Sequence, residues 1–284
     1  MNRLSRILKP FMPILAALYG FMMIYVTALP MAGENKTFGH EFLSWMLTLA
    51  AIALSYVLVY RGVPRVFPEA KQFSLKLPSL FVAVGLLLMT PLCFVVKNYI
   101  VFGLTSLIHP VQLEPITYTY GELREDLLAS LHAVLLAPVL EELCYRQLAI
   151  SPFRRRWVQV MVCVVMAFLF GILHVRNFLG AFLDAMLFGL VFIWMRNIWF
   201  AVLLHAGSNL TATLLAVYCM LNLGEIQMSK IPVILLPDTM VIVATMALAV
   251  IGLLMLKLKQ RKHDDNRVRM ESHSIVREMI KKKL

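Results

Sequence analysis

Three short polar clusters interrupt the most apolar part of this 284-residue sequence. They are Glu141-Glu142-x-x-x-Arg146, His174 at the end of the string FGILH, and His205-x-x-x-Asn209. Ionisable side chains are costly inside a membrane helix, and their presence there points to function. Together these residues offer a proton acceptor, two imidazoles and an amide donor. A general base, a group that holds water and oxyanion donors together are typical of a hydrolase.

Helical spacing separates the roles of the two glutamates. Glu142 and Arg146 are four residues apart, so they share a helix face and can neutralise each other as an ion pair. Glu141 lies about 100° away around the helix and is not neutralised by that pair. A carboxylate without its own cation in a low-dielectric site is suited to general-base catalysis. We therefore expect Glu141 to be the reagent and the Glu142–Arg146 pair to support it.

The two histidines supply the remaining groups. The imidazole of His174 could hold a water or a metal beside Glu141. His205 and Asn209 are four residues apart, so both project the same way and could stabilise an oxyanion. A zinc site made by Glu141, His174 and His205 is the alternative. Asn209 is a poor zinc ligand, so its pairing with His205 favours the metal-free chemistry.

Long apolar segments must position these clusters. The chain is 60% hydrophobic and only 15% charged, with a mean hydropathy of +0.78, whereas a soluble domain has about 25% charged residues. The predicted fold class is all-α, a polytopic transmembrane helical bundle. About eight segments approach or exceed the ~18 apolar residues that a spanning helix needs: 11–30, 42–60, 79–96, 126–148, 157–175, 178–195, 198–220 and 232–256.

The distribution of basic residues predicts the orientation of the chain. With these spans, 22 of the 27 Lys and Arg residues fall on one side. Because cytoplasmic loops retain positive charge, both termini are expected in the cytoplasm. The predicted domains are a transmembrane protease domain, 1–256, and a basic cytoplasmic tail, 257–284. The net charge of +11 therefore requires no nucleic acid. The tail could lie on anionic lipid, although a simple topology anchor is favoured.

The predicted spans leave two features of the sequence without an explanation. Asp184 interrupts the sixth span with no evident partner. Counting ~1.5 Å per residue from the inner charges, Glu141, His205 and His174 would lie ~20, ~13 and ~27 Å deep. Since these groups must converge, we expect a shifted span boundary or a tilted or broken helix, with Pro138 and Pro152 as available break points.

In this order and spacing, the clusters resemble the motifs of a known family. EELCYR at 141–146, FGILH at 170–174 and HAGSN at 205–209 are similar to the E-E-x-x-x-R, F-x-x-x-H and H-x-x-x-N motifs of the CAAX-processing and bacteriocin-processing (CPBP, or Abi) intramembrane endopeptidases. The resemblance covers about residues 126–215. Asp184 departs from it, because the family usually has small or apolar residues in that stretch.

The resemblance implies a role for each motif residue. Glu141 and His174 would activate water, and His205 and Asn209 would stabilise the oxyanion. Glu142 and Arg146 would support them. Family names suggest a metalloprotease, but a glutamate mechanism without metal agrees with the resemblance too, so zinc as a cofactor stays open.

The predicted function is hydrolysis of a peptide bond in a membrane-associated peptide or protein, within a bacterial plasma membrane. Two alternatives remain open. One is a bacteriocin-immunity or interaction membrane protein that binds its partner without cutting it. The other, less favoured, is a transporter that uses Glu141 and the histidines as a proton relay.

Overall fold

Helices make up most of the chain that the computed structural model describes, which is residues 3–31, 38–108, 129–174 and 177–223. Six of these helices are long and apolar enough to cross a membrane, and they correspond to six of the eight predicted spans. They are Leu4–Ala28, Gly39–Val66, Leu80–Asn98, Arg156–Leu173, Phe178–Met195 and Ile198–Tyr218. The all-helical membrane architecture is thereby confirmed. The predicted span 232–256 and the tail after it lie outside the described residues.

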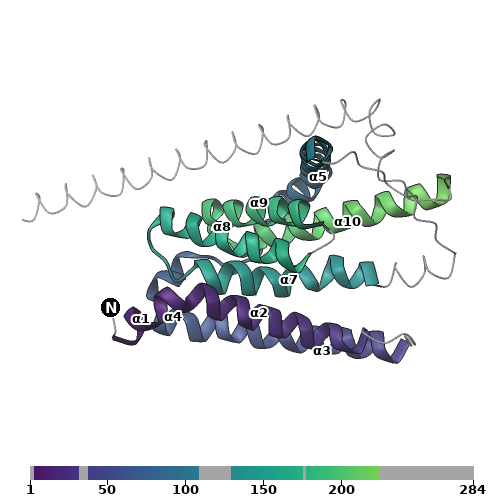
Figure 1. The fold of residues 1–284 in the computed structure, drawn as a ribbon. Helices are drawn as coiled ribbons and strands as arrows, with labels where there is room; N and C mark the ends of the chain where they lie inside the picture. The colour runs from purple at the N-terminus through teal and green to yellow at the C-terminus, as the bar shows by residue number, and fades with distance from the viewer. Residues whose placement is uncertain (1–2, 32–37, 109–128, 175–176, 224–284) are drawn as a thin grey trace, which may run out of the picture. The chain divides into compact units, whose positions relative to one another are not determined.

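The elements follow from uninterrupted apolar runs. Figure 1 shows α2 and α3 side by side, with α7 between them and the group α8 to α10. The bounds are α1 (Arg3–Leu8), α2 (Met12–Ala28), α3 (Phe38–Val57), α4 (Val63–Val66), α5 (Leu80–Ile108), α7 (Ala137–Glu142), α8 (Arg156–Leu173), α9 (Phe178–Met195) and α10 (Ile198–Leu223). A π-helical turn, η3 (Leu58–Gly62), joins α3 to α4.

The predicted span 126–148 is not one regular helix. Residues 129–135 are helical, Leu136 forms a turn, and α7 then runs into a π-helical turn, η5 (Leu143–Leu148). Pro138 explains the break, because it lacks an N–H and its ring excludes the carbonyl four residues earlier. Both of the break points that the sequence offered lie at turns, at Leu136 beside Pro138 and at residues 151–152. The first motif therefore lies on a short helical segment that begins just before it.

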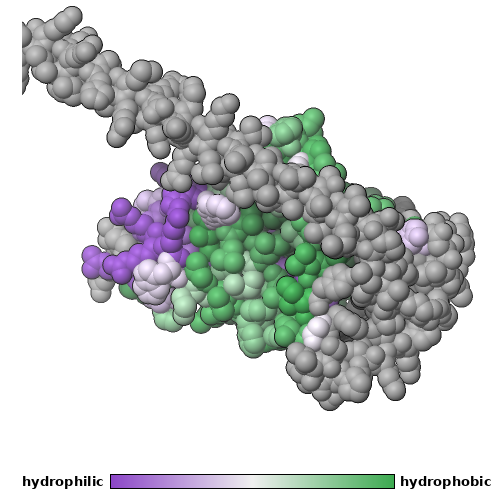
Figure 2. Space-filling model, turned by 90° about the horizontal axis from the view of Figure 1, so that it is seen from above, coloured by the Kyte–Doolittle hydropathy of each residue, from purple (hydrophilic) through white to green (hydrophobic). Residues whose placement is uncertain are grey.

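The surface of these helices is apolar. Large hydrophobic side chains are exposed on each long helix, including Phe21 on α2, Phe81 on α5 and Leu214 on α10. Figure 2 shows hydrophobic residues across the middle of one face and hydrophilic residues gathered at one end. Such a surface suits lipid tails, which are as apolar as leucine.

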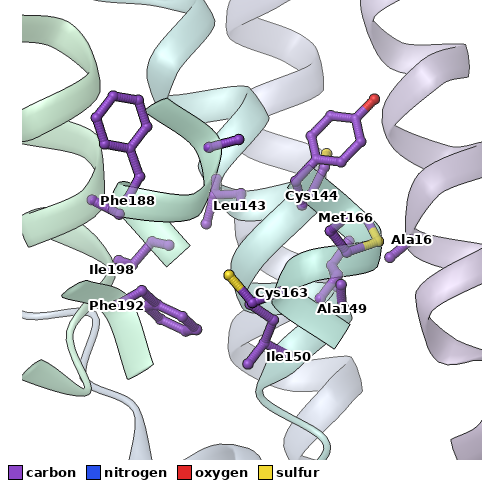
Figure 3. Packing of buried hydrophobic residues seen from close by; sticks show 14 of the residues in the cluster. Ala16, Leu143, Cys144, Ala149, Ile150, Cys163, Met166, Phe188, Phe192 and Ile198 are labelled. Carbon is purple, nitrogen blue, oxygen red and sulfur yellow. The ribbon is translucent and has the colours of Figure 1, made fainter. Parts of the chain in front are cut away.

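Small side chains let the helices approach the first motif closely. A Cβ on Gly20 of α2 would lie 3.1 Å from the Cβ of Cys144 and 3.2 Å from the Tyr145 ring, so any larger residue would have to displace these side chains by a few tenths of an ångström. Figure 3 shows how side chains from five segments meet around η5. They are Ala16 of α2, Leu143 and Cys144 of η5, Cys163 and Met166 of α8, Phe188 and Phe192 of α9, and Ile198 of α10.

Residues 61–78, between the second and third predicted spans, are partly helical, and their last part docks on the turn between α9 and α10. The Ser74 N–H donates to the Arg196 carbonyl (2.7 Å), and the Ser74 carbonyl accepts from the Ile198 N–H (3.2 Å). The Trp199 indole donates to the Leu75 carbonyl at 2.9 Å. The first N–H groups of a helix lack partners within the helix, so these bonds help to fix the start of the helix that carries the third motif.

Candidate active site

His205 lies between the two glutamates of the first motif. Its Nδ1 is 3.0 Å from Oε1 of Glu142, and its Nε2 is 3.6 Å from Oε2 of Glu141. An ionised carboxylate only accepts hydrogen bonds, so Nδ1 carries the hydrogen in the contact with Glu142. Glu142 therefore turns the ring so that Nε2 faces Glu141. The expected meeting of the first and third motifs is confirmed.

Arg146 holds Glu142 from the other side. Its Nε is 3.0 Å from Oε2 of Glu142, which confirms the predicted ion pair. Its Nη2 donates to the Ala185 carbonyl of α9 at 3.1 Å, and its guanidinium lies 5.4 Å from the centre of the Phe170 ring of α8. Glu142 is 0% and Arg146 2% exposed. The pair therefore ties the first motif to both neighbouring helices.

Two carboxylates and one guanidinium meet at this site. Ionised Glu141 and Glu142 carry two negative charges, and Arg146 carries one positive charge. His205 contacts both carboxylates. Uncompensated charge is costly in a buried, low-dielectric place. His205 can offset the second negative charge when both of its ring nitrogens carry hydrogen.

Aromatic rings link the second motif to His205. The Phe170 ring lies 4.4 Å from the ring of His174 and 5.9 Å from that of His205, between centroids. Phe188 of α9 stacks on His205 at 4.9 Å. His174 directly follows the last residue of α8 and is exposed. Its Nδ1 is hydrogen-bonded to the carbonyl oxygen of Phe170 at 2.9 Å. Phe170 therefore contacts both histidines. Within the described residues, His174 makes no direct hydrogen bond to Glu141.

Asn209 lies one turn beyond His205 on α10. Its Nδ2 donates to the carbonyl of Ala133 at 2.8 Å, which ties α10 to residues 129–135. A side-chain amide has two N–H donors, so this bond leaves one of them for another acceptor. The oxyanion role predicted for Asn209 would use the second N–H.

Asp184 has a partner that the sequence did not reveal. Its Oδ2 is 2.6 Å from Nζ of Lys97 on α5 and 3.5 Å from the hydroxyl of Ser208 on α10. The two charged residues are 87 positions apart, and no motif connects them. The sequence indicated only that each of these charged residues lies in or beside an apolar span.

A comparison of the sequence with family models bears on this site. Residues 123–211 match the model of the family described as Type II CAAX prenyl endopeptidase Rce1-like. The match contains all three motifs. This segment is an Rce1-like peptidase domain. The resemblance predicted from the motifs is therefore confirmed for this segment, and the matched model describes endopeptidases. Comparisons with curated proteins and with solved structures give no match.

The Rce1-like domain does not fit the zinc site that the sequence left open. Among the described residues, no three His, Cys, Asp or Glu side chains are grouped as metal ligands. Glu141 and His205 contact each other at 3.6 Å, but within that part of the chain His174 does not join them as a third ligand. The arrangement therefore does not form the three-ligand site that catalytic zinc requires.

Besides the partner of Asp184, sequence reasoning missed two features of the Rce1-like domain. One is the second partner of Glu142, which bonds His205 as well as Arg146. The other is the use of Phe170 as a common contact for both histidines. Helical spacing within one segment can reveal an ion pair such as Glu142–Arg146, but contacts between segments depend on how the helices pack.

Proposed function

We propose that this chain is an intramembrane endopeptidase that hydrolyses a peptide bond of a membrane-associated peptide or protein. The observation that carries the proposal is the position of His205, 3.0 Å from Glu142 and 3.6 Å from Glu141. It puts a proton acceptor and a potential oxyanion donor side by side within a largely buried site. The Rce1-like domain supports the peptidase class.

In the proposed reaction, Glu141 takes a proton from a water molecule as the water oxygen bonds to the carbonyl carbon of the substrate. The carbonyl oxygen becomes an oxyanion, which accepts hydrogen bonds from His205 Nε2–H and from the second amide hydrogen of Asn209. The C–N bond then breaks, and Glu141 returns the proton to the departing amine. Glu142 and Arg146 hold His205, and His174 helps to position the water.

The proposed setting is a bacterial plasma membrane with both termini in the cytoplasm. The distribution of Lys and Arg supports this orientation. The transmembrane domain would extend over 1–256, and the tail 257–284 would serve as a topology anchor that can also contact anionic lipid. The substrate would reach the site from within the bilayer.

Cleavage by the purified protein tests the proposal. We expect the full chain, in detergent or lipid nanodiscs, to cut an internally quenched peptide that ends in a farnesylated CAAX sequence. In parallel, new peptide termini would be compared by mass spectrometry in membranes that contain the wild-type protein or Glu141→Gln. Termini that depend on Glu141 would identify the substrate even when the farnesylated peptide is a poor one.

Other outcomes would favour the other functions. Absence of Glu141-dependent cleavage in both assays would contradict the peptidase proposal. Protection against a bacteriocin that survives Glu141→Gln would indicate an immunity protein. Proton-coupled uptake that is lost in Glu141→Gln would indicate a transporter.

Chelation tests the metal-free form of the mechanism. We expect cleavage to persist after treatment with a strong chelator, and we expect the purified protein to lack stoichiometric zinc, because no step above uses a metal. Metal content would be measured by mass spectrometry on the same sample that is assayed. Stoichiometric zinc, with activity lost on its removal and restored by adding it back, would overturn this mechanism and support Glu141, His174 and His205 as ligands.

A further inference from the structure

An ion pair joins α5 to α9 inside the membrane-spanning part of the chain. Lys97 Nζ lies 2.6 Å from Asp184 Oδ2, and the two side chains are only 10% and 17% exposed. Lys97 also lies over the Phe94 ring, 4.7 Å from its centre. A charged group at such a position is costly unless it is paired. The pair therefore binds the two helices together at one defined place.

On α9, the turn that begins at Asp184 contacts the candidate active site at two points. The next residue, Ala185, accepts the hydrogen bond of Arg146 through its carbonyl at 3.1 Å. One turn further on, Phe188 stacks on His205, with 4.9 Å between the ring centres. A shift of this turn would therefore move both the support of the first motif and the imidazole of the third.

Asp184 of this pair also contacts α10, at Ser208 within the third motif. The hydroxyl of Ser208 lies 3.5 Å from Asp184 Oδ2, and Ser208 directly precedes Asn209. At the neighbouring Gly207, an added Cβ would lie 2.5 Å from the Thr90 side chain of α5. Helices α5 and α10 therefore pack closely at this point, with the ion pair beside the contact.

We propose that Lys97 and Asp184 are a positioning pair for the third motif. The pair fixes α5 and α9 around α10, and thereby sets the direction in which His205 and Asn209 point. It acts through these residues and does not touch the reacting groups. The inference rests on the proposed function, and Asp184 is the position at which this chain departs from the pattern of small and apolar residues.

Single and double substitutions should behave differently. Lys97→Met or Asp184→Asn alone leaves one buried charge unpaired, so each should lower the midpoint of thermal unfolding. The double variant K97M/D184N removes both charges, and replacing a buried pair by neutral groups is often harmless to stability. Its unfolding midpoint should therefore return toward that of the wild type. Its kcat should stay lower, because α5 no longer holds α9 in place.

The experiment measures kcat, KM and the unfolding midpoint of the full chain in nanodiscs. The substrate is the farnesylated CAAX peptide. If that peptide is not cut, the Glu141-dependent substrate found in membranes replaces it. For K97M/D184N we expect kcat to fall by about 10²-fold, the scale of a small misplacement of reacting groups, with KM little changed. The matched control is K9M/E69Q, which removes the ion pair of 2.9 Å between Lys9 and Glu69 near the N-terminus and should leave kcat unchanged.

A second variant keeps the test decisive if K97M/D184N does not fold. Asp184→Glu retains both charges but lengthens the link by one methylene group, so the fold should persist while kcat falls. A wild-type kcat in either folded variant would overturn the inference, since the pair would then serve only the fold. Glu141→Gln is assayed beside them. Cleavage that does not depend on Glu141 would instead contradict the proposed function.

Discussion

Glu141→Gln should lower kcat by about 10²–10⁴-fold, the usual contribution of a general base, and leave the unfolding midpoint unchanged. Glutamine keeps the shape of the side chain but cannot take the proton from water. Glu141 makes no ion pair with Arg146, and its contact with His205 Nε2 is long, at 3.6 Å. The substitution should therefore change the free energy of unfolding very little. Rates and unfolding midpoints would be measured on the same purified samples.

Glu142→Gln provides the contrast within the same motif. Glu142 is fully buried and bonds both Arg146 and His205, so its substitution should lower stability as well as rate. Glu41→Gln makes the same chemical change in the first turn of α3 and serves as the control. An active Glu141→Gln beside an inactive but well-folded Glu142→Gln would mean that the two glutamates have the opposite roles.

Arg146→Ala should destabilise the protein by ~3–5 kcal/mol, because it leaves Glu142 buried and unpaired. It also removes the hydrogen bond to Ala185 and the contact with Phe170. Unfolding can be followed with a thiol-reactive dye, since Cys144 and Cys163 are 0% and 2% exposed in the folded chain. The dye should react at a clearly lower temperature than with the wild type.

The double variant E142Q/R146M separates the charge effect from the packing effect. With both charges gone, a large part of the lost stability should return. Thiol labelling of Arg146→Ala at the wild-type temperature would show that the ion pair does not stabilise this fold. A double variant no more stable than Arg146→Ala would show that the packing of Arg146, and not its charge, is what matters.

Much of the architecture could be predicted because it depends on local properties of the sequence. Runs of apolar residues long enough to span a bilayer identified the six helices that the structure describes as candidate spans. Helical spacing identified the Glu142–Arg146 pair, since both partners lie within one turn of each other. The break at Pro138 followed from the chemistry of proline itself.

Contacts between distant segments could not be predicted in the same way. Lys97 and Asp184 are 87 residues apart, and neither spacing nor composition indicates that α5 packs beside α9. The depth estimate made Glu141 and His205 seem misaligned, because it counted a regular helix back from the basic residues 154–156. The helical segment instead ends at residue 150 and contains the π-helical turn η5, so Glu141 lies nearer to the end of its helix and contacts His205 at 3.6 Å.

The irregular helical segment 129–150 has a consequence for the biosynthesis of the protein. It carries Glu141, Glu142 and Arg146, and a charged residue at the centre of a membrane helix costs roughly 2.5–3.5 kcal/mol on insertion scales. The Glu142–Arg146 pair offsets part of this cost within the segment, but the other partners, the Ala185 carbonyl and His205, leave the ribosome later. The segment therefore remains a poor membrane helix until α9 and α10 have been made, and the site is completed only at a late stage of insertion.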